Sequence, residues 1–419
     1  MEDGGTVAFD AQVEDWQRMG MRLARTLDAG DPFGSVRAAV SFGHRYASDR
    51  DSLPQTNSER AFRLVAQATE LIDYELPFAE PARADRIIAE ARGMLEQART
   101  LDPHCHDAAR MIAAQDRPSF DEFYHYLTEG DAAVRADCER ARDAVNLPDP
   151  EACRLARDLA FLPYLRWLAN ESSRALICGR YRKAIEHATE LARLDENGIA
   201  DADLTLAIAH TKLEDQTALD ELSAKGGGPM GNAWLALATL AMAYKRRDMS
   251  AATQATSQII AKWPHAALTL ELQDELPDGV FSRIVVEPGS EDELILAVSE
   301  FSIVLQEGRD SNERGSLGGW LASLPMVRTQ AELDAQAELR EGRGEATRAP
   351  RATTAPPREA SADARMGGTR RALCREALAQ PGRPFGRRLP GAGDRRPRQS
   401  RALRGRRRRG GLPGGRPRA

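Results

Sequence analysis

The residues best suited to bind a metal ion in this sequence are His104, Cys105 and His106. A zinc site needs three or four such ligands converging at about 2 Å. Further donors such as His125 or Cys138 would have to be brought to the cluster by the fold. Because the cluster directly follows Leu101-Asp102-Pro103, an ordinary, partly exposed turn also explains it. We favour the turn, and we expect no metal site and no cofactor.

The common catalytic and nucleotide-binding motifs do not occur in the sequence. In Lys225-Gly-Gly-Gly-Pro229 the lysine precedes the glycines, which is the wrong order for a phosphate-binding loop. The segment from Gly315 to Gly318 lacks the Gly-x-Ser-x-Gly pattern of a hydrolase nucleophile. Carboxylates are abundant, and we expect nearly all of them to lie on solvated helix faces. The sequence therefore predicts a protein that is not an enzyme.

Two other groups of residues are candidates for binding. Four aromatic residues cluster within one predicted helix, and we expect them to form core with one exposed ring, or alternatively a ligand groove: Phe120, Phe123, Tyr124 and Tyr126. Two small basic patches stand out in an acidic region: Arg180, Arg182 and Lys183, and Lys245, Arg246 and Arg247. They could grip a carboxylate-bearing partner, or they could be ordinary cations near helix ends, where the helix dipole favours them.

The apolar spacing indicates helices along almost the whole chain. Arg45 to Gln55 is polar and is predicted to be a loop, Pro163 is expected to punctuate the chain, and the β-branched stretch Val280 to Val286 could form a short strand or an irregular helical turn. The predicted helices are Phe9–Leu27, one from Ser58 that ends before Pro77 and Pro81, Ala82–Leu101, Ala108–Ala114, Phe120–Val145, one from Ser290 to Leu305, and one within Leu317–Leu339.

Within these helices a motif recurs at about 34 residues, with starts near positions 165, 200 and 234. The first unit has Leu168 and Ser172 on one helix, Gly179 in the turn, Ala184 on the second helix, and Glu171 where leucine is expected. The later units supply Leu206-Ala207 and Leu240-Ala241 at the matching positions. In these features the chain resembles the tetratricopeptide family.

The resemblance implies an all-α fold in which antiparallel helix hairpins stack into a solenoid and hold another protein on a concave face. A single hairpin cannot bury its apolar side alone, so its neighbours share one core. We predict an N-terminal helix and loop over residues 1–56, helical repeats over 57–265, a helical cap over 266–340 and a tail over 341–419.

The predicted tail differs sharply in composition from the rest of the chain. From Glu341 to Ala419 there are 22 Arg, no Lys and 6 acidic residues, so that segment carries about +16 and the preceding residues about −21 of the net −5. Such a sequence cannot build a core, and we expect disorder. Two interpretations compete: an arginine-rich arm that binds nucleic acid, and translation of GC-rich DNA out of frame.

The remaining signals concern the compartment. Five scattered cysteines without CxxC spacing favour a reducing compartment. The N-terminus, Met-Glu-Asp-Gly-Gly, has no apolar core of a secretory signal. The longest apolar run, Ala233 to Tyr244, is too short for the roughly 20 residues that span a bilayer. We therefore expect a cytoplasmic scaffold that binds a protein or peptide, no membrane partner, and nucleic acid as a partner only if the tail is genuine.

Overall fold

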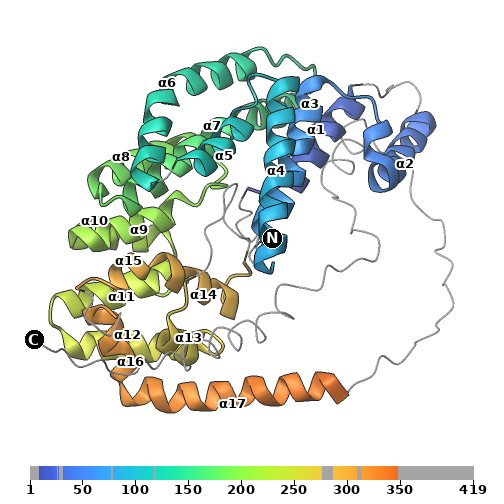
Figure 1. Cartoon of the computed structure of the whole chain (residues 1–419). Coiled ribbons are helices and arrows are strands. Elements are labelled where there is room, and N and C mark those ends of the chain that lie inside the picture. The colour runs from blue at the N-terminus through green and yellow to red at the C-terminus, as the bar shows by residue number, and fades with distance from the viewer. Residues whose placement is uncertain are drawn as a thin grey trace, which may run out of the picture.

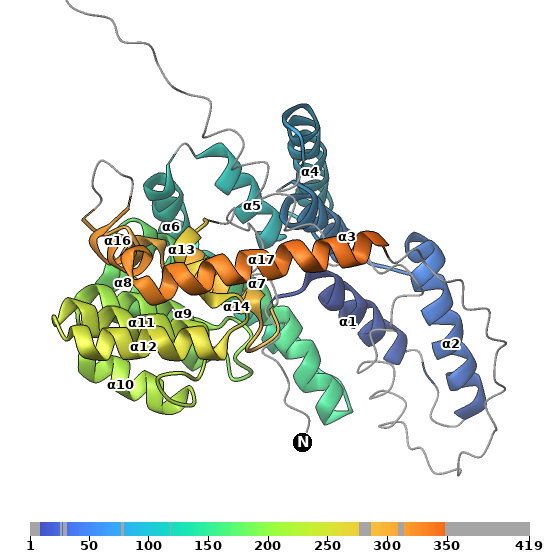
Figure 2. The same ribbon diagram turned by 90° about the horizontal axis from the view of Figure 1, so that it is seen from below.

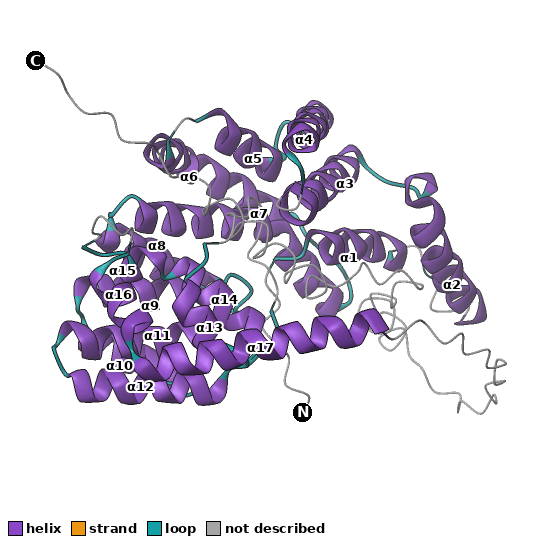
Figure 3. Ribbon diagram, turned by 60° about the horizontal axis from the view of Figure 1, so that its bottom comes forward, coloured by secondary structure: helices purple, strands orange, loops and turns teal. Residues whose placement is uncertain are grey.

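The computed structural model describes residues 9–25, 27, 32–76, 79–117, 119–275, 286–308 and 314–347. All regular structure in these ranges is helical and none is strand (Figure 3), which confirms the predicted all-α class. No helix in the same ranges has both the length and the apolar character needed to cross a membrane. Residues 280–285 of the stretch that could form a short strand or an irregular helical turn, and most of the predicted tail, lie outside the described residues.

The helices follow an arc from α2 at one end to α17 at the other (Figure 1), and a perpendicular view keeps α1–α4 well apart from α10–α12 (Figure 2). The N-terminal part contains α1 (Ala11–Ala24), α2 (Pro32–Asp49), a 3₁₀ turn (Arg50–Ser52), α3 (Asn57–Thr69), a π-helical segment (Glu70–Glu75), α4 (Pro81–Leu101), α5 (His106–Asp116), α6 (Phe120–Asp143) and α7 (Pro150–Ile177). The rest of the arc contains α8 (Tyr181–Leu194), α9 (Ala202–Leu213), α10 (Gln216–Lys225), α11 (Ala233–Lys245), α12 (Met249–Lys262), α13 (Ala266–Leu272), α14 (Glu291–Glu300), α15 (Ser302–Leu305), α16 (Ser316–Ser323) and α17 (Pro325–Thr347).

The N-terminal helix α1 packs against α3 and α7 rather than standing apart from the other helices. The loop predicted for Arg45 to Gln55 is wrong over its first residues, because α2 continues to Asp49. The apolar side of α2 is short and aromatic, so it lacks the long leucine stripe that reveals a helix in sequence. Phe42 and Tyr46 on that side pack against Trp16 of α1.

The prediction that Pro163 interrupts the chain is also wrong, because Pro163 lies inside α7. Proline has no N–H to donate to the carbonyl four residues earlier, which normally weakens a helix. The carbonyl in question belongs to Leu159, and it accepts a hydrogen bond of 3.0 Å from Nη2 of Arg18 on α1. The freed acceptor therefore has a partner from another helix, and α7 continues through the proline.

Three helix pairs follow one another from α7 to α12, and their turns share one geometry. The turn residues Gly179, Glu214 and Arg247 all have positive φ, at 72°, 58° and 61°. In each turn the next backbone amide donates to the carbonyl five residues earlier: Arg180 to Ala175 at 2.8 Å, Asp215 to His210 at 3.0 Å, and Asp248 to Ala243 at 3.0 Å. This is the Schellman ending of a helix, which satisfies carbonyls that the helix leaves free.

The C-terminal helices return to the earlier ones. Helix α13 contacts α12 and α17, while α14 contacts α11 and α15 contacts α9. Ser290, the predicted start of this helix, caps α14 with its side chain. The carboxylate of Glu293 accepts hydrogen bonds from the Gly289 amide, the Ala233 amide and the Trp263 indole. Leu317–Leu339, predicted to contain one helix, contains α16 and the start of α17, because Pro325 begins a new helix. Helix α17 continues to Thr347, beyond the predicted start of a disordered tail.

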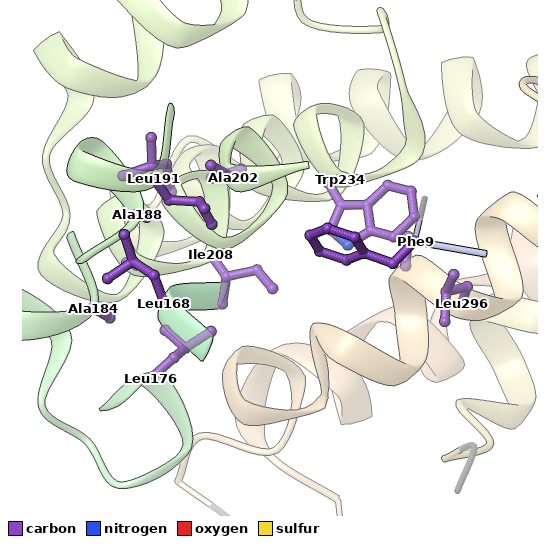
Figure 4. Packing of buried hydrophobic residues seen from close by; sticks show 14 of the residues in the cluster. Phe9, Leu168, Leu176, Ala184, Ala188, Leu191, Ala202, Ile208, Trp234 and Leu296 are labelled. Atoms are coloured by element: carbon purple, nitrogen blue, oxygen red, sulfur yellow. The ribbon is translucent and has the colours of Figure 1, made fainter. Parts of the chain in front are cut away.

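One apolar core runs through most of the described chain. Buried residues from Phe9 to Val327 form a single connected cluster, and a close view shows Leu168 and Leu176 of α7 with Ala184, Ala188 and Leu191 of α8 (Figure 4). Alanines that are fully buried recur on α8, α9, α11 and α12, where helices approach one another closely: Ala184, Ala188, Ala207, Ala209, Ala236, Ala238, Ala241 and Ala252.

Candidate functional site

The six basic residues singled out in the sequence lie at two of the three hairpin turns. Arg180, Arg182 and Lys183 are at the start of α8, and Lys245, Arg246 and Arg247 are at the end of α11 and in the turn that follows. The first group therefore follows its turn and the second group precedes its turn. Arg180 occupies the N-cap position that Asp215 and Asp248 hold in the next two pairs, where both aspartates cap their helices and Arg180 does not.

Neighbouring turns contact one another, so they form a single edge of the molecule, which we call the turn edge. Lys212 at the end of α9 lies 5.3 Å from the centre of the Tyr181 ring. Nζ of Lys245 lies 3.5 Å from Glu214, and Arg246 donates to the Gln216 side chain at 3.2 Å. The two basic groups are therefore connected through the turn at Glu214.

Several of the basic side chains are already paired within the protein. Arg180 binds Asp121 at 2.9 Å and lies over the Tyr124 ring, and Lys183 pairs with Glu186. Arg182 and Arg247 are exposed, and we find no ion pair or hydrogen bond from either side chain within the described residues. These two arginines are the members of the predicted patches that remain available to a partner.

Lys245 belongs to a second arrangement, in which two lysines hold one carboxylate. Glu307, just after α15, lies 2.7 Å from Lys245 and 3.1 Å from Lys212. Burial alone would favour the neutral acid, but the hydrogen bonds from both lysines dominate and lower the pKa of Glu307. Lys245 therefore pairs with a carboxylate of this chain rather than with one from a partner. The contact connects the segment after α15 to the ends of α9 and α11.

The fold also completes the histidine cluster that the sequence left without further ligands. Nδ1 of His104 lies 2.9 Å from Oδ2 of Asp137 on α6, and Nε2 of His106 lies 3.2 Å from the same oxygen. The three donor atoms all lie within 4.8 Å of one another. Cys138 is a potential ligand by sequence, but successive residues on a helix point about 100° apart. Cys138 is buried in the core, and its neighbour Asp137 faces the histidines.

The titration behaviour of this cluster follows from its position between turn and core. Burial lowers the pKa of His106, which favours the neutral imidazole. The hydrogen bond with His104 lowers the pKa of Asp137. Burial raises the pKa of Cys105 to about 12, so its thiol stays protonated at neutral pH. Cys105 packs against the apolar core and is not one of the three clustered ligand residues, although it lies between the two histidines in sequence.

The aromatic cluster confirms the prediction of core with one exposed ring. Phe123 and Tyr124 are buried, Tyr126 is half-buried, and Phe120 is exposed. The Tyr126 ring packs against Trp167 at 5.6 Å between centroids, and the Arg117 guanidinium covers it at 4.1 Å. These contacts join α6 to α7 and account for the clustering.

The expectation that nearly all carboxylates are solvated is wrong at the junction of α1, α5 and α7. Arg166 is fully buried and binds Glu14 at 2.7 Å and Asp107 at 2.5 Å. Arg110, also fully buried, lies 3.2 Å from Asp107. Burial alone would raise the pKa of Asp107, but the charge of Arg166 and its hydrogen bonds, with a contribution from Arg110, lower it. We call these four residues the buried ion cluster; their spacing in sequence is too long for any local motif to reveal them.

Glu171, which replaced the expected leucine of the repeat pattern, is also buried. Its carboxyl lies 3.2 Å from Nδ1 of His187 on α8. Burial raises the pKa of Glu171 to about 8, with a further contribution from the charge of Asp131. The acid is therefore largely protonated at neutral pH.

No family model, no curated protein and no solved structure matches this chain.

Proposed function

We propose that the chain is a helical-repeat protein of the tetratricopeptide type that binds a partner protein or peptide. The observation that carries this proposal is the repeated turn. Gly179, Glu214 and Arg247 all have positive φ. In each turn the amide of the next residue donates to the carbonyl five residues before it. The three turn residues are 35 and 33 residues apart, close to the 34-residue period of the family. A polypeptide that repeats a turn at this interval builds its hairpins in one orientation.

The contacts between pairs support a stacked arrangement. Helix α9 contacts α7, α8, α10 and α11, so the first helix of one pair packs on both helices of the pair before it and on the first helix of the pair after it. In stacked repeats each unit contacts its neighbours and little else, which produces an extended surface. Such surfaces are used to hold other proteins rather than to build a deep catalytic pocket.

The turn edge is the proposed binding surface, rather than a concave face formed by α9 and α11. Helices α14 and α15 already cover α11 and α9, and Figure 1 draws α14 between α11 and the open side of the arc. At the turn edge, Arg182 and Arg247 are exposed and Arg180 and Arg246 add partly paired charge. A partner that presents carboxylates would fit this edge, and its affinity should fall with added salt.

Quantitative mass spectrometry of proteins captured by the full chain tests this proposal. We expect the double variant R182E/R247E to capture the specific partners several-fold less than the wild type, because reversal of a rim charge mainly slows association. The matched control is R60E/R86E, which reverses two exposed arginines on α3 and α4. Equal capture by both double variants, or no capture above background by the wild type at low salt, would contradict the proposal.

A cytoplasmic location remains part of the proposal and is supported by the cysteines. Cys105, Cys138, Cys153 and Cys178 are all free thiols. Free thiols are typical of reducing compartments. Nucleic-acid binding through residues 341–419 stays a separate prediction, which requires binding that weakens with salt and disappears when the chain is truncated after Arg340.

A further inference from the structure

We propose that His104, His106 and Asp137 form a binding site for Zn²⁺. Oδ2 of Asp137 lies 2.9 Å from Nδ1 of His104 and 3.2 Å from Nε2 of His106, and all three donor atoms lie within 4.8 Å of one another. Zinc bonds of 2.0–2.2 Å in a tetrahedron place neighbouring donor atoms roughly 3.3 Å apart. Two of the three separations are therefore close to those of a zinc site, and His104 is exposed enough to adjust the third.

The three ligand residues lie on three backbone segments that contact one another or are fixed by hydrogen bonds. His106 is the first residue of α5 and Asp137 lies on α6, which packs against α5. His104 lies in the turn between α4 and α5, where its amide donates to the Asp102 side chain at 3.0 Å and the Cys105 amide donates to the Asp102 carbonyl at 3.0 Å. A site whose ligands sit on helices and on a hydrogen-bonded turn loses little entropy when the ion binds.

His106 provides the second observation in favour of a ligand. Its Nε2 atom is buried and makes no well-aligned hydrogen bond among the described residues, although the Asp137 carboxylate is 3.2 Å away. A buried polar atom without a good hydrogen bond is unusual and calls for a partner. A metal ion between the imidazole nitrogen and the carboxylate oxygen would satisfy both, with the ring proton on the other nitrogen.

The donor set selects the class of ion. Two imidazole nitrogens and one carboxylate oxygen suit zinc, whereas magnesium and calcium prefer oxygen ligands. With three ligands from the protein, the fourth position is left to water or to a group from a partner, as in open zinc sites. Arg140 competes with the ion, because its guanidinium pairs with Oδ1 of Asp137. From the sequence we expected no metal site, because Asp137 was not among the possible ligands considered there.

Calorimetric titration of the full chain with Zn²⁺ tests the site. We expect one ion per chain for the wild type and at least a ~100-fold loss of affinity in H104Q, H106Q and D137N, since even outer-shell changes cost 10–100-fold. R140Q removes the competing cation and should strengthen binding by about two- to fivefold, as exposed ion pairs are weak. Because His104 is 71% exposed, H104Q is expected to fold normally.

The matched control is H125Q, which removes another exposed histidine. His125 lies 3.5 Å from the carboxylate of Asp121 and has no third ligand among the residues that the structure describes. Its zinc affinity should equal that of the wild type. Cobalt substitution separates this site from the free thiols, because binding by imidazole and carboxylate gives no intense sulfur-to-cobalt absorption. The proposal is overturned if the wild type binds no zinc, if the ligand variants bind it as well as H125Q does, or if cobalt reports thiolate ligands.

Discussion

Two interfaces within the same helical arc are held together by opposite chemistry. Where α1, α5 and α7 meet, the contact is the buried ion cluster of Glu14, Asp107, Arg110 and Arg166. Where α11 packs against α9 and against α12, the buried residues are apolar, and they include fully buried alanines such as Ala207, Ala241 and Ala252. The stability of the first interface depends on the pairing of its buried charges. The stability of the second depends on side chains small enough to fit at the buried alanine positions.

The difference shows what each interface demands of a mutation. Buried charges lose hydration, and only complete pairing compensates for that loss. Closely packed alanines form no specific polar contact, but they fix the distance between helices, so that added volume forces the helices apart. The ion cluster should therefore be most sensitive to removal of a group, and the alanine interface to addition of one.

The largest effect is expected from Arg166→Met, which leaves the buried carboxylates of Glu14 and Asp107 with one cation each, Arg18 and Arg110. We expect the free energy of unfolding to fall by roughly 3–5 kcal/mol, measured from urea denaturation. The double variant E14Q/R166M should regain part of this loss, because it removes one carboxylate together with the guanidinium and keeps Asp107 paired with Arg110. Arg193→Ala is the control, since Arg193 forms an exposed ion pair with Glu190. A loss for R166M no greater than that for R193A would show that the cluster does not hold the junction.

The second expectation concerns the alanine interface and uses two positions on α12. Ala252→Leu adds three carbon atoms at a fully buried position and should reduce the free energy of unfolding by about 1–3 kcal/mol through overpacking. Ala261→Leu makes the same change at an exposed position of the same helix and should be nearly neutral. Urea midpoints of the two variants would contradict the comparison if they were equal.

The same contrast explains which parts of the structure could be predicted from the sequence. The pairs from α7 to α12 were predictable because alanine and leucine recur at a fixed interval, and turns such as the one at Gly179 recur with them. The helix α2, the continuation of α7 through Pro163 and the histidine site were not predictable in the same way. Arg18 reaches the Leu159 carbonyl, and Asp137 reaches the histidines, only after distant helices have packed.

Glu171 is a buried ionisable residue within the repeats, as Glu14 and Asp107 are at the first interface. It should make stability depend on pH. Its pKa is raised to about 8 in the folded protein from an ordinary value of 4.5, so unfolding releases its proton between those values. The stabilisation of the folded state by the neutral acid is therefore complete below about pH 4.5 and is lost as the pH rises towards 8. Glu171→Leu, which restores the residue of the repeat pattern, should remove this dependence.

The useful window for that measurement is pH 6.5 to 8. Burial lowers the pKa of the neighbouring His187 from 6.5, and that effect reduces stability only as the pH falls below its ordinary value. Between pH 6.5 and 8 the wild type should lose roughly 1.6 kcal/mol more than E171L, because the slope of about 1.4 kcal/mol per pH unit falls to half that value as the pH reaches the pKa of about 8. Glu171→Gln, which keeps the shape without the charge, should behave like E171L in this window. The same slope in all three proteins would contradict a buried, protonated Glu171.

The smallest effect is expected where charges meet at the surface, between Lys245 and Glu307. A double-mutant cycle with Lys245→Met and Glu307→Gln should give a coupling of about 0.2–1 kcal/mol, because Glu307 is 44% exposed and water screens the pair. The coupling should decrease in high salt and as the pH falls through the lowered pKa of Glu307. Lys183 and Glu186 form a matched exposed pair on α8 that does not connect two elements. A coupling at Glu307 well above that of this pair would mean that the contact between α15 and the repeats is itself an organised interface, closer in kind to the buried ion cluster than to a surface ion pair.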